Sequence, residues 1–142
     1  MQKIFVATIF LCAMILTSTA SAENWVSLGT DNLGNEYFLD TESVALEKHE
    51  GNRVKFYSKS RTVFTDKGRQ KLGQENLASV VFLYAFANNN GQKLVAELSV
   101  KATALDGSLI EELTANSTRW EKVTPNTVIG AVYDAAYKHL RL

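Results

Sequence analysis

Hydrophobic and polar residues alternate with a period of two in several segments of the chain, which is typical of strands with one buried face. The second of two long apolar runs within residues 78–105 shows this best; the first, residues 79–86, is dense in β-branched and aromatic residues, and Asn-Asn-Asn-Gly at residues 88–91 separates the two. Asn and Gly tolerate the positive φ of a tight reversal. We therefore predict an antiparallel hairpin, with the apolar positions of its second strand on one face. Those positions are Leu94, Ala96, Leu98, Val100, Ala102 and Ala104.

Shorter strand patterns flank this hairpin on both sides. Between them lie residues that favour turns, among them Gly51-Asn52 and Asp106-Gly107. A polar turn is predicted at residues 40–44, a charged connection at 47–52, a turn at 66–68 and a surface loop at 69–76. The strands are predicted at residues 24–28, 37–40, 53–64, 108–113 and 120–123.

The hydrophobic period changes from two to that of a helix after Pro125, the only proline. Thr124 is predicted as the helix cap and Pro125 as its first residue. The helix has to bury its apolar stripe, and one face of the sheet is available. The predicted fold class is α+β: an antiparallel meander sheet of about six strands with one C-terminal helix on one face. The stripe consists of Ile129, Val132, Tyr133, Ala136, Tyr137 and Leu140.

Residues 1–22 have the pattern of a signal peptide. Lys3 precedes an apolar stretch at residues 4–16, and a small-x-small triplet ends at Ala22. The apolar stretch is shorter than the ~20 residues of a membrane-spanning helix. We predict cleavage after Ala22 and export to the periplasm, the cell surface or the medium. Because Cys12 is not preceded by a small residue, no lipid anchor is predicted.

Length and composition indicate one domain at residues 23–142. The chain has 142 residues, with 15 Lys and Arg against 15 Asp and Glu, and this balance points to no class of partner. A domain of this size buries roughly two-thirds of its unfolded surface and can form one core. Its only cysteine lies in the predicted signal peptide, so no disulfide or thiolate site is expected in the domain.

The sequence patterns that indicate catalysis or metal binding are missing. The two histidines, His49 and His139, have no further ligand at metal-binding spacing. No Gly-x-Ser-x-Gly motif occurs, and no glycine-rich loop precedes a helix. Glu111 and Glu112 are neighbours and so lie on opposite faces of a strand. We therefore expect a protein that is not an enzyme and needs no cofactor or metal.

The clearest functional pattern is a basic strand. Residues 53–71 contain seven Lys or Arg and one acid. Aligned like charges repel, so they favour an anionic partner: an acidic protein segment, an acidic glycan or an anionic lipid headgroup. In the alternative, this is an ordinary solvated face, whose cations protect an exposed strand and are neutralised by Glu97 or Glu111. The candidate binding residues, named here the basic face, are Arg53, Lys55, Tyr57, Lys59 and Arg61.

The aromatic residues near the ends of the domain are predicted to pack rather than to bind a ligand. Trp25 and Trp120 lie near the ends of short strands, where an indole usually fills the core or its rim. Tyr133 and Tyr137 belong to the apolar stripe of the helix and are predicted core residues.

The chain resembles the surface-adhesin protein E-like family over essentially all of residues 23–142. No single motif is very specific, and the likeness rests on the order and spacing of several. The matching segments are Trp25-Val26, residues 37–44, Asp106-Gly107, residues 120–127 and Ala131-Val132-Tyr133.

This resemblance implies an antiparallel sheet with one C-terminal helix, often in a homodimer. The best-known member of the family is a bacterial surface adhesin that binds host matrix and serum proteins such as vitronectin, laminin and plasminogen. Adhesin-like binding is therefore the expected function, without nucleic acid. Family members often carry two cysteines that this domain lacks, and the adhesin is lipid-anchored. These departures support the alternative of a periplasmic structural or envelope-assembly protein with no host ligand.

Overall fold

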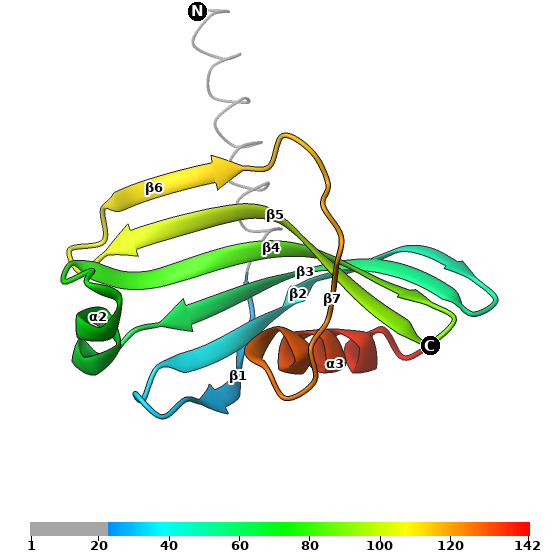
Figure 1. Ribbon diagram of the computed structural model, residues 1–142, viewed down its shortest axis with the longest axis horizontal. Coiled ribbons are helices and arrows are strands. Elements are labelled where there is room, and N and C mark those ends of the chain that lie inside the picture. The colour runs from blue at the N-terminus through cyan, green and yellow to red at the C-terminus, as the bar shows by residue number, and fades with distance from the viewer. Residues whose placement is uncertain (1–22) are drawn as a thin grey trace, which may run out of the picture.

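The computed structural model describes residues 23–142, and the predicted signal peptide lies outside them. One antiparallel sheet follows the chain in the order β1-β2-β3-β4-β5-β6 (Figure 1). A short strand, β7 (Glu121–Lys122), pairs with β5 in addition. The predicted α+β fold with a six-stranded meander is thus confirmed. The six strands are β1 (Trp25–Thr30), β2 (Glu36–Glu50), β3 (Arg53–Val63), β4 (Leu77–Asn89), β5 (Gln92–Ala104) and β6 (Leu109–Thr114).

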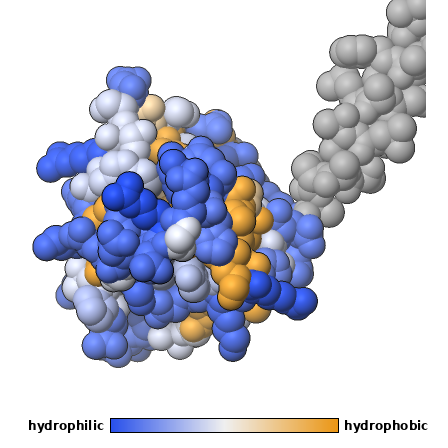
Figure 2. Space-filling model, turned by 90° about the vertical axis from the view of Figure 1, so that its right-hand side faces the viewer, coloured by the Kyte–Doolittle hydropathy of each residue, from blue (hydrophilic) through white to orange (hydrophobic). Residues whose placement is uncertain are grey.

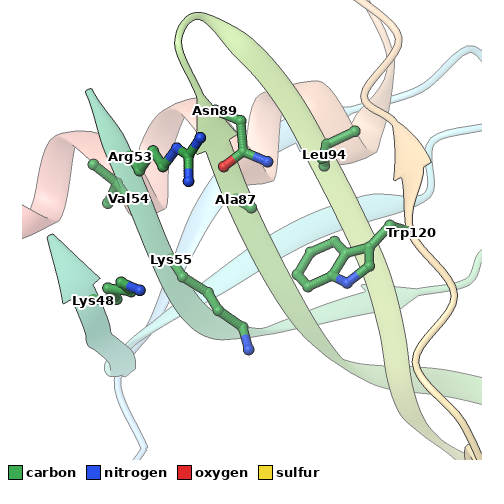
Figure 3. A pocket seen from close by; sticks show the side chains of 8 residues that line it. All are labelled: Lys48, Arg53, Val54, Lys55, Ala87, Asn89, Leu94 and Trp120. Atoms are coloured by element: carbon green, nitrogen blue, oxygen red, sulfur yellow. The ribbon is translucent and has the colours of Figure 1, made fainter. Parts of the chain in front are cut away.

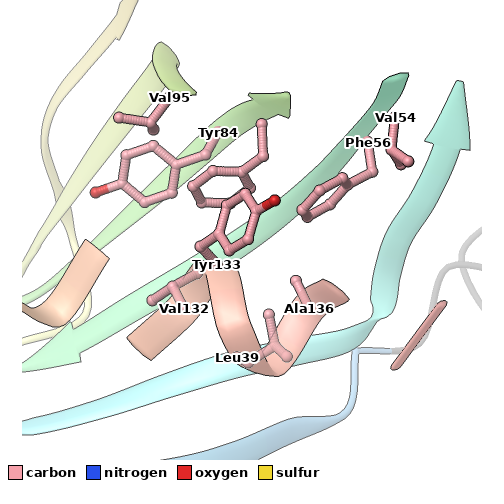
Figure 4. Close-up of a cluster of buried hydrophobic side chains, with 9 residues drawn as sticks. Leu39, Val54, Phe56, Tyr84, Val95, Val132, Tyr133 and Ala136 are labelled. Atoms are coloured by element: carbon pink, nitrogen blue, oxygen red, sulfur yellow. The ribbon is translucent and has the colours of Figure 1, made fainter. Parts of the chain in front are cut away.

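The C-terminal helix, α3 (Val128–Leu140), lies on one face of the sheet, as predicted. We call this the helix-bearing face and the opposite one the open face. The Tyr133 ring lies 5.3 Å from that of Phe56 and 5.4 Å from that of Phe86, measured between centroids. Val132 and Ala136 complete the buried side of the helix (Figure 4). Within residues 23–142, no helix is long and apolar enough to cross a membrane.

β3 confirms the predicted alternation. It lies inside the sheet, between β2 and β4, so its cations do not protect an exposed strand edge, contrary to the alternative interpretation. Every second residue is buried, and Phe56 is the centre of the core. The intervening side chains, those of the basic face, lie on the open face. The buried residues are Val54, Phe56, Ser58, Ser60 and Thr62.

β2 is much longer than the strand predicted at residues 37–40. The turn predicted at 40–44 and the connection predicted at 47–52 are wrong, because both segments belong largely to β2. The strand passes two irregularities in its pairing with β3. At the first, the carboxylate of Asp40 accepts a hydrogen bond from the backbone of Glu42 at 3.1 Å. Such local bonds also occur in turns, which is why the sequence pattern suggested one.

A short helix, α2 (Asp66–Leu72), replaces the turn and loop predicted at residues 66–68 and 69–76. The Thr65 side chain caps it by accepting a bond from the backbone of Gly68 at 3.1 Å. Gly73 ends the helix at a φ of 67°. A glycine in the middle and few apolar positions conceal this helix from a reading of periodicity.

A bulge in β5 corrects the prediction that its apolar residues share one face. Leu83 pairs with Ser99 and Tyr84 with Glu97, so Leu98 has no partner. One extra residue exchanges the faces of all residues that follow it. Leu94 and Ala96 therefore lie on the open face, whereas Val100, Ala102 and Ala104 lie on the helix-bearing face.

The start of α3 also differs from the prediction, which had Thr124 as cap and Pro125 as first residue. The cap is Thr127, whose hydroxyl accepts a bond from the backbone of Gly130 at 3.1 Å. The same hydroxyl donates to the carbonyl of Thr124 at 2.7 Å. Asn126 has a φ of 59°, in the left-handed region, and this backbone turn after Pro125 delays the start of the helix.

Candidate functional site

The structure places all five residues of the basic face on the open face of β3, as the alternation predicts. Arg53, at the start of the strand, is exposed, and the other four are partly exposed. Their surroundings differ, however, so they do not form a uniform row of free charges.

In the middle of the basic face, Glu47 of β2 neutralises Lys55. Lys55 Nζ lies 2.8 Å from Glu47 Oε2, and the Tyr57 hydroxyl donates to Glu47 Oε1 at 2.5 Å. Lys55 and then Tyr57 lower the pKa of Glu47, and Glu47 raises the pKa of Lys55. The prediction that Glu97 or Glu111 provides this charge is wrong, since their cross-strand partners put both on the helix-bearing face.

At the far end of the basic face, Arg61 is held by aromatic rings. Its guanidinium lies 4.6 Å from the ring centre of Trp25 and 5.1 Å from that of Phe38. These cation–π contacts connect β3 to β1 and β2 and leave the charge less accessible. Lys59 has no ion-pair partner among residues 23–142. Arg61 thus contributes mainly to packing, whereas Lys59 remains available to a partner.

A groove with a volume of about 370 Å³ lies at the Arg53 end of the basic face (Figure 3). It combines three cations, one amide, one indole and a small apolar surface. These side chains come from β2, β3, β4, β5 and the segment before β7. The lining residues are Lys48, Arg53, Val54, Lys55, Ala87, Asn89, Leu94 and Trp120.

The sequence prediction missed three polar or aromatic residues of the groove, Lys48, Asn89 and Trp120, and it had Trp120 as a packing residue. Trp120 is 36% exposed, and Lys55 Nζ lies 5.8 Å from the centre of its ring. Pairing of Lys122 with Leu94 holds β7 beside β5 and so places the indole above the groove. The sequence predicted a strand at residues 120–123 but not its pairing with β5, which places Trp120 at the groove.

The charge at the groove is more positive than negative. Lys48 lies 3.5 Å from Glu50, but both side chains are exposed, and such pairs contribute little. Lys55 is paired with Glu47. Arg53 forms no ion pair within the described chain. Figure 2, which views this end of the molecule, shows a largely hydrophilic surface with narrow apolar strips.

The arrangement is suited to binding anions. Within residues 23–142, no three His, Cys, Asp or Glu side chains come together to hold a metal ion. Burial, together with Asp31, raises the pKa of Tyr37 to about 12, and burial also raises the pKa of Tyr84. Both tyrosines lie outside the groove and stay protonated at neutral pH. The groove itself offers hydrogen-bond donors and positive charge.

Comparison with known proteins yields no match to this chain among family models, curated proteins or solved structures. The resemblance to the surface-adhesin protein E-like family therefore stays a prediction from the sequence.

Proposed function

We propose that the protein is an exported, non-enzymatic binding module that holds an anionic partner at the groove end of the basic face. One observation carries the proposal: three cations, Lys48, Arg53 and Lys55, converge on one groove. Arg53 forms no ion pair in the described chain, although Glu50 is its cross-strand partner on β2, so its guanidinium can pair with an incoming anion. A guanidinium binds carboxylate, sulfate or phosphate through paired hydrogen bonds.

The partner that we propose is a protein with acidic segments or an acidic glycan. The family resemblance suggests host matrix and serum proteins such as vitronectin, and the predicted signal peptide suggests export. Charged contacts of this kind act over several ångströms, and salt screens them. Binding should therefore weaken as the ionic strength rises.

The test is binding of the purified protein to immobilised vitronectin and to heparin, at low and at moderate salt. The decisive variant is Lys48→Glu with Arg53→Glu, which reverses two charges at the groove. Its control is Lys67→Glu with Lys71→Glu, the same change of charge on α2, at the other end of the sheet (Figure 1). We expect salt-sensitive binding that the groove variant loses and the α2 variant keeps.

Two results would contradict this proposal. Binding that is equally strong at both salt concentrations would exclude a mainly ionic contact. Equal loss in both variants would show attraction to overall charge rather than to the groove.

A second candidate function is assembly into an envelope structure through the free edge of β6. All six residues of this strand are exposed, including the apolar Leu109, Ile110 and Leu113. Light scattering tests this function. A self-associated state that persists in the groove variant but disappears on Ile110→Lys would favour assembly, and a monomer at all concentrations would exclude it.

A further inference from the structure

The groove contains an aromatic wall and a flat apolar floor beside its cations. Trp120 forms the wall, and its indole faces Lys55 across the groove (Figure 3). Ala87 and Leu94, which are cross-strand partners on β4 and β5, contribute to the floor. Ala87 has a short side chain that is only 7% exposed, so a ligand on this floor would lie close to the backbone of β4. A simple anion needs neither an indole nor an apolar floor.

A sugar ring would use these additional features. A pyranose has a flat face of C–H groups that packs against an aromatic ring or an apolar surface, while its hydroxyls point outward. The amide of Asn89 can donate to and accept from such hydroxyls. The volume of about 370 Å³ is at the small end of ligand sites and suits one or two sugar units.

The cations determine which kind of sugar fits. Arg53 and Lys48 stand at the side of the groove away from Trp120 (Figure 3). A neutral sugar would leave the guanidinium of Arg53 without a counter-charge, whereas a carboxylate or sulfate on the ring would pair with it. Lys59 lies further along the same face of β3, where a second charged unit of a polymer could follow.

We propose that the groove binds an acidic sugar unit of a polysaccharide, a uronic acid or a sulfated hexosamine. Its ring packs against Trp120, its hydroxyls contact Asn89, and its anionic group binds Arg53 and Lys48. This inference rests on the proposed function and specifies the chemical class of the ligand. It differs from general attraction to polyanions because Trp120 takes part.

The first test is fluorescence titration with a heparin tetrasaccharide. The chain has two tryptophans, so Trp25→Phe leaves Trp120 as the only one. We expect a saturable change in Trp120 emission. Calorimetry then measures the affinities of Trp120→Phe and Trp120→Ala in the same background, because neither variant retains a tryptophan. Trp120→Phe should keep part of the affinity. Trp120→Ala should weaken binding about tenfold, the loss expected for one aromatic contact. Unchanged affinity in Trp120→Ala would overturn the sugar proposal.

The charge contribution has its own pair of variants. Arg53→Gln should weaken tetrasaccharide binding at least about fivefold, consistent with one charge-assisted contact. Lys71→Gln removes the same charge on α2 and should leave the affinity unchanged. Circular dichroism and thermal unfolding of each variant show whether it is folded. Equal losses in Arg53→Gln and Lys71→Gln would overturn binding in the groove.

Two further ligands separate this inference from the proposed function. Polyglutamate has a similar charge but no sugar ring, and carboxyl-reduced, desulfated heparin has rings but no charge. We expect weaker binding of both, and the binding of polyglutamate, unlike that of the two sugar ligands, should not depend on Trp120. Polyglutamate binding as tight as that of the tetrasaccharide would reject the sugar and retain an anionic protein partner. If no polyanion binds at all, the proposed function fails as well.

Discussion

At the scale of single residues, Asp31 shows how one carboxylate organises a turn. It accepts hydrogen bonds from the backbone of Leu33 at 2.9 Å and of Asn35 at 3.0 Å. The Tyr37 hydroxyl and the Asn35 amide donate to its other oxygen at 2.5 Å and 3.0 Å. The bond from Tyr37 is the largest cause of the lowered pKa of Asp31, and burial opposes it. The charged form of Asp31 is therefore favoured by folding.

We predict that Asp31→Asn lowers the free energy of unfolding at pH 7 by about 1–2 kcal/mol, because bonds to a charged acceptor are replaced. The folded pKa is below the unfolded value of about 3.9, so the stabilisation is complete above that value. It is lost as the pH falls through the folded pKa. Urea unfolding at pH 7 and near pH 3 should show that the difference between Asp31→Asn and the parent narrows in acid.

The control for this prediction is Asp106→Asn. Asp106 also has a lowered pKa, mainly through the Ser108 hydroxyl, but it lies on an exposed turn. Its replacement should change stability less than that of Asp31. A difference between Asp31→Asn and the parent that is the same at pH 7 and pH 3 would contradict the assignment to the charged carboxylate.

At the scale of elements, the two threonines before α3 have different roles. Thr127 caps the helix with its side chain, whereas Thr124 participates through its carbonyl. Thr127→Ala should lower the free energy of unfolding by about 1 kcal/mol, the usual effect of a lost N-cap. Thr124→Ala should change it clearly less. Thermal unfolding of the two variants checks this, and a larger effect at Thr124 would restore the helix start expected from the sequence.

The attachment of α2 depends on Gly68. A Cβ atom at this position would come within 2.1 Å of Asn35 Oδ1, which is buried and accepts a bond from the backbone of Thr65. Gly68→Ala should therefore destabilise the protein by about 1–3 kcal/mol, although alanine ordinarily favours helices. Chemical denaturation measures this loss.

A double-mutant cycle identifies the cause of the Gly68→Ala effect. If the clash with Asn35 is responsible, Gly68→Ala should cost less when Asn35 is already alanine. Lys67→Ala, at an exposed position of the same helix, is the control and should have little effect. If Gly68→Ala lowers the free energy of unfolding equally with Asn35 and with alanine at position 35, another contact is responsible.

The sequence predicted those elements whose periodicity is regular. β3 and the stripe of α3 follow their patterns over many residues, so one irregular position does not obscure them. The bulge at Leu98 depends on a single unpaired residue and reverses the faces after it. The lining of the groove also depends on irregular strand pairing. Lys48 reaches the groove because the pairing of β2 with β3 shifts, and Trp120 reaches it because β7 pairs with β5. Such positions follow from strand pairing across the sheet, which periodicity along the chain does not encode.

At the scale of the whole molecule, the sheet ends in an exposed edge strand, β6. Apolar residues on such an edge invite pairing with other chains, and charges oppose it. Glu111 and Glu112 stand in the middle of this strand, both exposed. Another β6 pairing antiparallel to it would bring these acids together. The edge thus combines apolar side chains that favour association with acidic side chains that weaken it.

Replacing Glu111 and Glu112 by threonine should therefore promote self-association. Size-exclusion chromatography with light scattering should show a larger apparent mass, which increases with concentration. The control is Glu23→Thr with Glu42→Thr, which removes the same charge at exposed positions beside β1 and on β2, at the opposite side of the sheet from β6. The same mass for both variants would show that net charge, rather than the edge, governs association.

The pairing of β3 with β4 has a consequence for how the molecule behaves in time. The register from Arg53 opposite Asn89 to Val63 opposite Ser79 has no shift, unlike that of β2 or β5 with its neighbours. Amide hydrogens here, such as that of Phe56, should exchange with deuterium last, only when the whole molecule unfolds. The cations of the basic face would then keep their spacing of about 6.8 Å for alternate residues, even while the outer strands open and close. The two cations of β3 without an ion pair or an aromatic contact, Arg53 and Lys59, would thus stay at a constant separation while other parts of the sheet move.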